Sequence, residues 1–200
     1  MHYGYIGLGN LGAACAGCLV KAGFKVTVYD LNAKLAEPLI AMGAVLATSA
    51  EELAGSVDHV ITCLPSPAVS ERVLRNILPQ MKAGSSWVEM STLGRDEVLK
   101  LAAIAGESGV RMMELPVTGG VHLAYQGKIT MLAGGDKDLF DLHHGAMLPI
   151  YKRRNGTGTR ACRDRAERGI RRRLCRQKYF GFEVFCRHHF ALGCGRVCSW

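Results

Sequence analysis

Six residues near the start of the chain have the types and the spacing of a phosphate-binding turn. They are Gly7, Leu8, Gly9, Asn10, Leu11 and Gly12, which read GxGxxG between an apolar strand and a helix. In this pattern Gly7 allows the tight turn, Gly9 lets the backbone approach a pyrophosphate, and Gly12 lets the helix pack closely on the strand. The N-terminus of the helix then presents N–H groups and a positive dipole end to the phosphates. The pattern predicts a dinucleotide site, and a glycine-rich turn without a ligand is the plainer alternative.

A carboxylate stands at the end of the next expected strand. Asp30 follows Gly7 by 23 residues, where an acidic side chain accepts hydrogen bonds from the adenosine ribose and repels a 2′-phosphate. The four residues that follow it contain no Arg. We therefore expect NAD as the cofactor, with NADP as the alternative. A turn or capping role is the other interpretation of Asp30.

Short apolar strands alternate with helices over the first 150 residues. We expect strands at 3–7, 25–30, 44–47, 59–64, 86–90, 110–115 and 129–132. Helices are expected at 11–22, from Asn32 to about 43, briefly after a Ser49–Glu52 capping box, from 67 to about 81, and at 96–108 and 137–149. Apolar strands that alternate with helices indicate an α/β fold with a doubly wound, mostly parallel sheet of the Rossmann type. Such sheets bind ligands at the carboxyl ends of their strands.

The bulk composition excludes several classes of protein. The chain has 200 residues, of which 48% are hydrophobic and 21% charged, as in ordinary globular proteins. No apolar run reaches the roughly 18–20 residues of a membrane span, and no signal-peptide pattern opens the chain. We therefore expect a cytoplasmic protein with no membrane partner and no disulfide framework. Cys15, Cys18 and Cys63 fall in apolar patterns and are expected to be small buried hydrophobes.

The net charge of +8 comes from the last quarter of the chain. Residues 1–150 hold 11 Lys and Arg against 14 Asp and Glu, or −3, whereas residues 151–200 hold 14 against 3, or +11. The last 50 residues also carry five of the eight cysteines and show no strand–helix alternation. Only Ala166, Ile170 and Leu174 could support one weak helix. We therefore expect a dinucleotide-binding domain at 1–150 and a basic Cys/Arg-rich tail at 151–200 that is not an independent domain.

Three motifs, in order and correctly spaced, resemble the β-hydroxyacid dehydrogenase family, which includes 3-hydroxyisobutyrate dehydrogenase and tartronate semialdehyde reductase. They are GYIGLGNLGAACAGCLVKAGFKVTVYDLN at 4–32, VEMST at 88–92 and ELPVTGGVHLAYQGKITMLAGGD at 114–136. The family usually has Met at the position of Leu11 and Ser at that of Thr118. The resemblance covers about residues 3–150. It implies reversible hydride transfer between NAD(P) and the hydroxyl-bearing carbon of a small β-hydroxy acid.

The resemblance also assigns roles to residues outside the glycine-rich turn. A hydroxyl and backbone N–H groups would bind the substrate carboxylate, as the anion chemistry of consecutive glycines allows, at Thr118, Gly119 and Gly120. Further contacts with the cofactor would come from Leu64, Pro65 and Thr92. The plainer interpretations are a strand end for Leu64 and Pro65, a helix cap for Thr92, and a simple turn for the Thr-Gly-Gly segment.

The proton-transfer residue of the family is missing. In the family it is a Lys in a GxGxxxK pattern on the helix after the Rossmann domain, with an Asn one turn later. The nearest match here begins at Gly156 and places Cys162 at the Lys position and Ala166 at the Asn position. A Cys with its ordinary pKa of about 8.5 is a poor proton donor, and the neighbouring Arg residues cannot act as bases. We therefore assign no catalytic residue and expect a chain that binds the cofactor but is catalytically impaired.

The resemblance also implies an all-helical C-terminal domain that closes the active site and builds a homo-oligomer, and this interface domain is missing. Enrichment in Arg, Cys, His and Gly without a period fits an out-of-frame reading of GC-rich DNA. Our hypothesis is a divergent or frameshifted C-terminus from about Tyr151 onward. The sequence then identifies neither the particular hydroxy acid nor the oligomeric state.

Three other interpretations stay open. The Arg pair at 153–154 and the Arg triplet at 171–173 could bind nucleic acid, although we expect no such partner. A zinc site could use Cys186, His188, His189, Cys194 and Cys198, but their spacing is unusual and we expect no metal. The third interpretation is a non-catalytic NAD-binding module.

Overall fold

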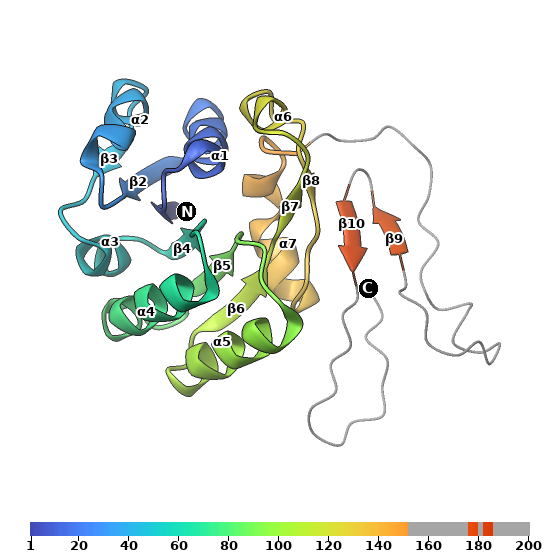
Figure 1. Cartoon of the computed structure of the whole chain (residues 1–200). Helices are drawn as coiled ribbons and strands as arrows, with labels where there is room; N and C mark the ends of the chain where they lie inside the picture. Colours follow the sequence, from blue (N-terminus) through green and yellow to red (C-terminus); the bar gives the residue numbers. More distant parts are fainter. Residues whose placement is uncertain (152–175, 180–181, 186–200) are drawn as a thin grey trace, which may run out of the picture.

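The computed structural model describes residues 1–151, 176–179 and 182–185, and its main feature is a six-stranded parallel sheet (Figure 1). The strand order is β3-β2-β1-β4-β5-β6. The strands are β1 (His2–Ile6), β2 (Lys25–Tyr29), β3 (Val45–Leu46), β4 (His59–Thr62), β5 (Ser86–Glu89) and β6 (Arg111–Glu114). The order reverses between β1 and β4, which places the expected ligand crevice at their carboxyl ends. The predicted doubly wound Rossmann fold is confirmed.

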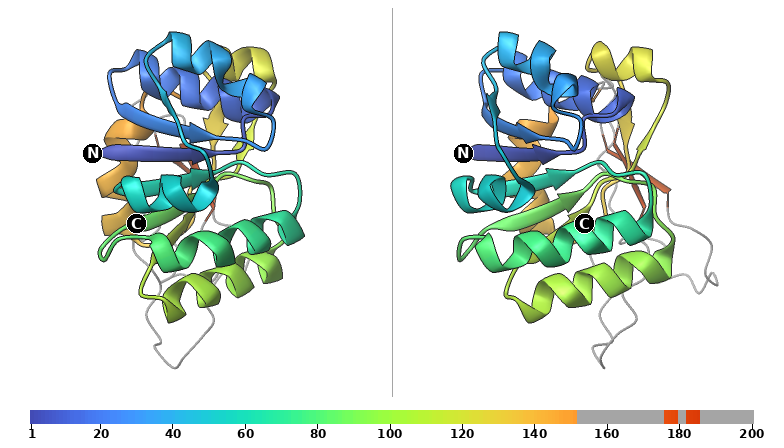
Figure 2. Two further views of the ribbon diagram at one scale, coloured as in Figure 1. Left: turned by 90° about the vertical axis from the view of Figure 1, so that its left-hand side faces the viewer. Right: turned by 60° about the vertical axis from the view of Figure 1, so that its left-hand side comes forward.

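Helices cover both faces of this sheet (Figure 2). They are α1 (Asn10–Lys21), α2 (Glu37–Ala41), α3 (Ala50–Ser56), α4 (Pro67–Ile77), α5 (Arg95–Glu107), α6 (Val121–Tyr125) and α7 (Lys137–Met147), with 3-10 turns η1 (Ala33–Ala36) and η2 (Leu78–Gln80). One core cluster joins α1, α2 and α7 to the sheet, and a second joins α3, α4 and α5 to the other face. Neighbouring strand residues alternate between the clusters, as a pleated strand requires: Trp87 enters the second and Val88 the first.

The helix expected at 32–43 is divided in the structure. Asn32 caps it as predicted, because its side chain accepts a hydrogen bond from the Lys34 backbone N–H at 3.3 Å. The chain forms only η1, however, before α2 begins beside Pro38. Proline lacks a backbone N–H and fits the first turn of a helix but not its interior, so a single continuous helix is excluded here.

The capping box expected at Ser49 forms only in part. The Ser49 hydroxyl accepts a hydrogen bond from the Glu52 backbone N–H at 3.0 Å, as predicted. The Glu52 carboxylate, in contrast, accepts hydrogen bonds from the backbone N–H and the hydroxyl of Thr48. The donor of the reciprocal bond is therefore Thr48, one residue before the Ser49 N–H that a capping box requires.

A smaller sheet follows the main one, with strand order β7-β8-β10-β9. Its strands are β7 (Val117–Thr118), β8 (Thr130–Met131), β9 (Arg176–Tyr179) and β10 (Phe182–Phe185). Of these, only β8 was predicted. In the tail, β9 and β10 pair antiparallel, and β10 adjoins β8. Neither of these two strands was predicted. The weak helix expected around Ile170 lies outside the described residues.

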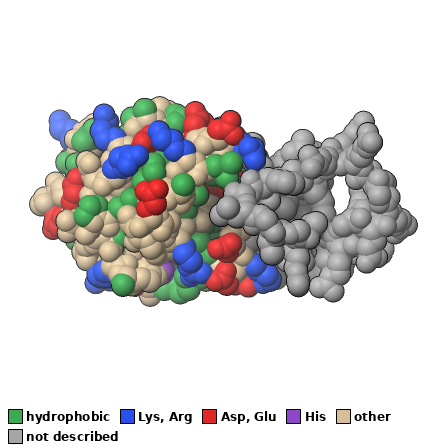
Figure 3. Space-filling view, turned by 90° about the horizontal axis from the view of Figure 1, so that it is seen from below, with side chains coloured by type: hydrophobic (Ala, Val, Ile, Leu, Met, Phe, Trp, Pro, Cys, Tyr) green, Lys and Arg blue, Asp and Glu red, His purple; other side chains and the backbone are tan. Residues whose placement is uncertain are grey.

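The burial of the cysteines and the distribution of surface charge can be compared with the sequence predictions. Cys15 and Cys18 are buried as predicted, while Cys63 is only partly buried. Basic and acidic side chains of the described residues are interspersed on the face in Figure 3, which therefore shows no patch of a single sign. Within the described ranges, no helix is long and apolar enough to cross a membrane.

Candidate functional site

A cavity of about 600 Å³ lies at the carboxyl ends of β1, β2 and β4. Its volume falls in the range of small-molecule and cofactor sites. Eight of the ten predicted cofactor residues line it: Gly7, Gly9, Asn10, Leu11, Gly12, Asp30, Leu64 and Pro65. Residues of α4 close it on one side. The structure thus brings together segments that are separated by up to about 70 positions in the sequence.

The three glycines of the turn have separate structural roles. Gly7 has φ +94°, and a Cβ there would overlap the carbonyl of Cys63. A Cβ on Gly12 would overlap the Gly7 carbonyl, so this glycine lets α1 pack against the turn. A Cβ on Gly9 would meet no atom within 4 Å, which leaves open space beside the backbone. The protein packing therefore requires Gly7 and Gly12, whereas the bare backbone at Gly9 suits the close approach of a ligand.

The N-terminus of α1 faces this opening without a competing side chain. Gly9 is the N-cap residue and supplies no side-chain hydrogen bond, and the first turn holds no acidic residue. The early N–H groups and the dipole of this 12-residue helix therefore favour an anion at the cavity.

Asp30 hydrogen-bonds to the backbone of the turn and also lines the cavity. Its Oδ2 accepts a hydrogen bond from the Leu8 backbone N–H at 2.7 Å, and its Oδ1 accepts one from Asn32 N–H at 2.9 Å. Each carboxylate oxygen can accept a further hydrogen bond. The turn role and the ribose-binding role are therefore compatible for Asp30.

Two predicted cofactor residues lie apart from the cavity lining. The Leu8 side chain is 1% exposed and packs in the core, so only its backbone N–H belongs to the site. Thr92 is exposed after β5, outside the lining residues. It is not the cap of α5 either, because Gly94 takes that position.

A hydrogen-bonded chain that the sequence analysis did not identify holds Leu64 beside the cavity. The Leu64 N–H donates to Ser91 Oγ at 2.7 Å, and the Ser91 N–H donates to Glu89 Oε1 at 2.7 Å. Glu89 is 1% exposed, and burial raises the pKa of its carboxyl. An acidic residue at the end of an otherwise apolar strand was the signal that could have indicated it.

Cys63 is the one thiol among the described cavity-lining residues. Burial, with the nearby Glu89 carboxyl, raises its pKa to about 11. It therefore remains a neutral thiol at physiological pH and is a poor nucleophile or base.

The predicted substrate loop forms a separate turn between β7 and α6. Thr118 is exposed at the end of β7, Gly119 has φ +124°, and Gly120 is the N-cap of α6. His122 folds back on this loop, since a Cβ on Gly120 would lie 2.6 Å from two atoms of its ring. None of the three predicted residues lines the cofactor cavity.

Residues 2–153 match the family described as the NAD binding domain of 6-phosphogluconate dehydrogenase. The chain belongs to this family. Its NAD-binding character and the predicted β-hydroxyacid dehydrogenase resemblance are thereby confirmed, and curated relatives carry the corresponding names.

Among these relatives, the mitochondrial 3-hydroxyisobutyrate dehydrogenase of Drosophila melanogaster is 35% identical over 135 residues, which are 67% of this chain and 42% of that protein. The 2-(hydroxymethyl)glutarate dehydrogenase of Eubacterium barkeri is 32% identical over 141 residues, 69% of this chain and 47% of that protein. A structure of Mycobacterium tuberculosis 3-hydroxyisobutyrate dehydrogenase with L-serine has a TM-score of 0.73 at 28% identity and covers 76% of this chain and 53% of that one. The chain spans about half the length of the curated relatives that it matches.

Several predicted features lie outside the described residues. They include the Gly156–Cys162 match to the family's Lys motif, Ala166, the arginine clusters and the candidate zinc ligands. Within the described part of the chain, no group of three or more metal-ligating side chains comes together.

Proposed function

We propose that this chain is the cofactor-binding half of an NAD-dependent β-hydroxyacid dehydrogenase. The reaction would transfer a hydride between the nicotinamide and a small β-hydroxy acid or its semialdehyde. The observation that carries this proposal is the single cavity in which the GxGxxG turn, Asp30 and the Leu64–Pro65 segment meet. The proposed activity is that of the dehydrogenases named among the relatives.

Each part of the cavity has a function toward the cofactor. The Gly9 backbone and the N-terminus of α1 would hold the pyrophosphate, and the free lone pairs of Asp30 would accept hydrogen bonds from the adenosine ribose. Leu64, which Ser91 fixes through its backbone, would support the cofactor from the opposite wall. When bound, the nicotinamide supplies or accepts the hydride.

The substrate carboxylate would bind at the turn formed by Thr118, Gly119 and Gly120. The exposed hydroxyl of Thr118 and the glycine N–H groups suit an anion, and His122 lies against the same loop. In the family a Lys transfers the proton, and the nearest match to its motif in this chain has Cys162 at that position. Cys63, the thiol in the described cavity lining, stays neutral because its pKa is raised to about 11. We therefore propose that the chain binds NAD but turns over very slowly.

Equilibrium titration of the purified chain with NADH, followed by fluorescence and by calorimetry, tests the binding half of this proposal. We expect saturable binding that Asp30→Ala weakens. Turnover is measured separately with 3-hydroxyisobutyrate, glycerate and related acids. Absence of saturable NADH binding would overturn the cofactor assignment, and rapid oxidation of any of these acids would overturn the proposed catalytic impairment.

The frameshift hypothesis has an independent test at the level of the gene. The two other reading frames after codon 150 should contain one that encodes a helix with the GxGxxxKxxN pattern. If neither does, the hypothesis is wrong.

A further inference from the structure

We propose that Arg72 of α4 covers the adenine base of the bound dinucleotide by stacking its guanidinium on the face of the ring. This inference rests on the proposed cofactor binding and adds to it a residue that recognises the adenosine half.

One face of α4 forms a wall of the cavity. Val69, Arg72, Val73 and Asn76 all line it. Their spacing of three and four residues places them on the same side of the helix. This wall combines two apolar side chains with one cationic and one amide side chain, a mixture that suits a flat base with polar edges.

The opposite wall comes from the segment after β2. Leu31 and Leu35 line the cavity there, next to Asp30. Leu31 is 90% exposed, which is unusual for a large apolar side chain and leaves it available to a ligand. A base whose ribose is held by Asp30 would therefore lie between leucines on one side and the face of α4 on the other.

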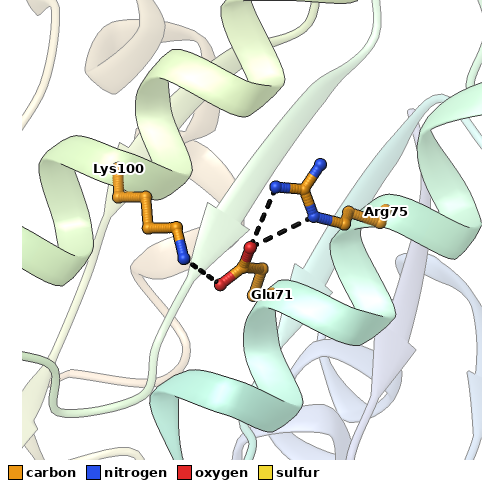
Figure 4. A network of polar contacts seen from close by, with 3 residues as sticks. All are labelled: Glu71, Arg75 and Lys100. Atoms are coloured by element: carbon orange, nitrogen blue, oxygen red, sulfur yellow. Dashed lines mark hydrogen bonds and ion pairs between the residues drawn. The ribbon is translucent and has the colours of Figure 1, made fainter.

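No side chain among the described residues pairs with the charge of Arg72. Its neighbour Glu71 is bound by two other cations, with Arg75 Nη2 at 2.9 Å and Lys100 Nζ at 2.6 Å (Figure 4). Arg72 itself has no hydrogen-bond or ion-pair partner among the described residues. It is also the one cation in the described cavity lining, where the other charged residues are Asp30 and Glu51. The guanidinium is therefore available to a ligand.

A guanidinium is suited to this task because it is planar, permanently charged and weakly hydrated. It stacks on aromatic faces, whereas a lysine ammonium presents only a point charge. From the usual strength of such contacts, we expect the stacking to improve binding roughly five- to thirty-fold.

The test compares Arg72→Ala and Arg72→Lys with the wild type in titrations of NADH, ADP-ribose and reduced nicotinamide mononucleotide, the last of which lacks adenosine. We expect Arg72→Ala to weaken NADH and ADP-ribose by the same factor, roughly five- to thirty-fold, and to leave the mononucleotide unchanged. Arg72→Lys should show most of that loss, because the planar group is gone. The matched control is Arg75→Ala, one turn along the same helix and engaged with Glu71, which should leave all three affinities unchanged.

Three outcomes would overturn the inference. The first is wild-type affinity for NADH in Arg72→Ala. The second is an equal loss for the mononucleotide, which would indicate a general disturbance of the site. The third is a much larger loss for NADPH than for NADH with recovery in Arg72→Lys, which would show that Arg72 binds the 2′-phosphate instead. If the wild-type chain itself fails to bind NADH, the proposed function fails, whereas normal binding with an indifferent Arg72 refutes only this inference.

Discussion

A buried pair of histidines at the amino ends of the strands predicts a steep loss of stability in mild acid. His143 of α7 accepts or donates hydrogen bonds on both ring nitrogens, with Tyr3 Oη 3.1 Å from Nδ1 and Ser86 Oγ 2.8 Å from Nε2. Ser86 Oγ also lies 2.9 Å from Nδ1 of His59, and the two imidazole rings are 4.7 Å apart. A proton added here would place a charge inside the core.

Burial is the main cause of the low basicity of His143, and the nearby His59 and Arg111 contribute to it. Together they lower the pKa of His143 from its ordinary 6.5 to about 3. Between these two values the unfolded chain binds a proton that the folded chain does not. The contribution of His143 to stability is therefore fully present above pH 6.5 and is lost as the pH falls toward 3. At pH 5.0 the loss amounts to about 2 kcal/mol, at 1.36 kcal/mol for each pKa unit.

Urea unfolding followed by circular dichroism at pH 7.5, 6.5, 5.5 and 5.0 measures this dependence. Asp58 faces His59 but stays ionised in this range, because the His2 backbone N–H lowers the pKa of its carboxyl. We expect His143→Gln, which cannot titrate, to be less stable than the wild type at pH 7.5. Between pH 7.5 and pH 5.0, its free energy of unfolding should fall by about 2 kcal/mol less than that of the wild type. The adjacent His144→Gln is the matched control and should keep the full decrease. An unchanged pH dependence in His143→Gln would refute the reasoning.

Four further substitutions test the stability of the fold or the binding of the cofactor. Gly12→Ala should lower the free energy of unfolding by about 2 kcal/mol, because its Cβ overlaps the Gly7 carbonyl. Gly9→Ala should change that free energy by less than about 0.5 kcal/mol yet weaken the binding of NADH about tenfold. Equal effects of the two substitutions in urea unfolding would contradict the assigned roles. Asp30→Asn should weaken NADH about tenfold and NADPH less, which parallel titrations check; a uniform loss would remove Asp30 as the discriminating residue. Burial raises the pKa of Glu89, so its contribution to stability falls as the pH rises above the ordinary range of a carboxyl. Glu89→Gln should therefore raise the free energy of unfolding at pH 7.5, and lower stability of the variant would show that the carboxylate is needed in the fold.

The glycine-rich turn could be predicted from the sequence because its determinants are local. Gly7 needs its positive φ for the turn, Gly12 must leave room for the Gly7 carbonyl, and Asp30 lies at the end of the next strand. The alternation of apolar strands and helices likewise determined the main sheet. Where the predictions differ from the structure, a short-range feature decided the outcome, such as Pro38 in the helix expected at 32–43.

The rest of the site depends on contacts between distant segments, which periodicity does not encode. Arg72 and Asn76 appear in the sequence as ordinary polar positions of an amphipathic helix, and only the packing of α4 across from Leu31 places them at the cavity. Glu89 and Ser91 act through the backbone of another strand end. The two-residue strand β7 and the five-residue helix α6 are too short to show a periodic pattern, although they shape the predicted substrate loop.

Mutations at the two ends of the sheet should have independent effects on the pH dependence of unfolding and on NADH affinity. None of Tyr3, His59, Ser86 or His143 lines the cavity, which lies at the carboxyl ends of the strands, whereas these residues meet at the amino ends. Protonation of the histidines changes the free energy of unfolding, but it does not change any group that would contact the dinucleotide. His143→Gln should therefore alter the pH dependence of unfolding while its NADH affinity at pH 7.5 stays at the wild-type value. Arg72→Ala should do the opposite, with weaker NADH binding and an unchanged pH dependence of unfolding. A change in both measurements for either variant would show that the two ends of the strands are coupled through the sheet. The affinity of the cofactor site would then depend on pH through the protonation of the buried histidines.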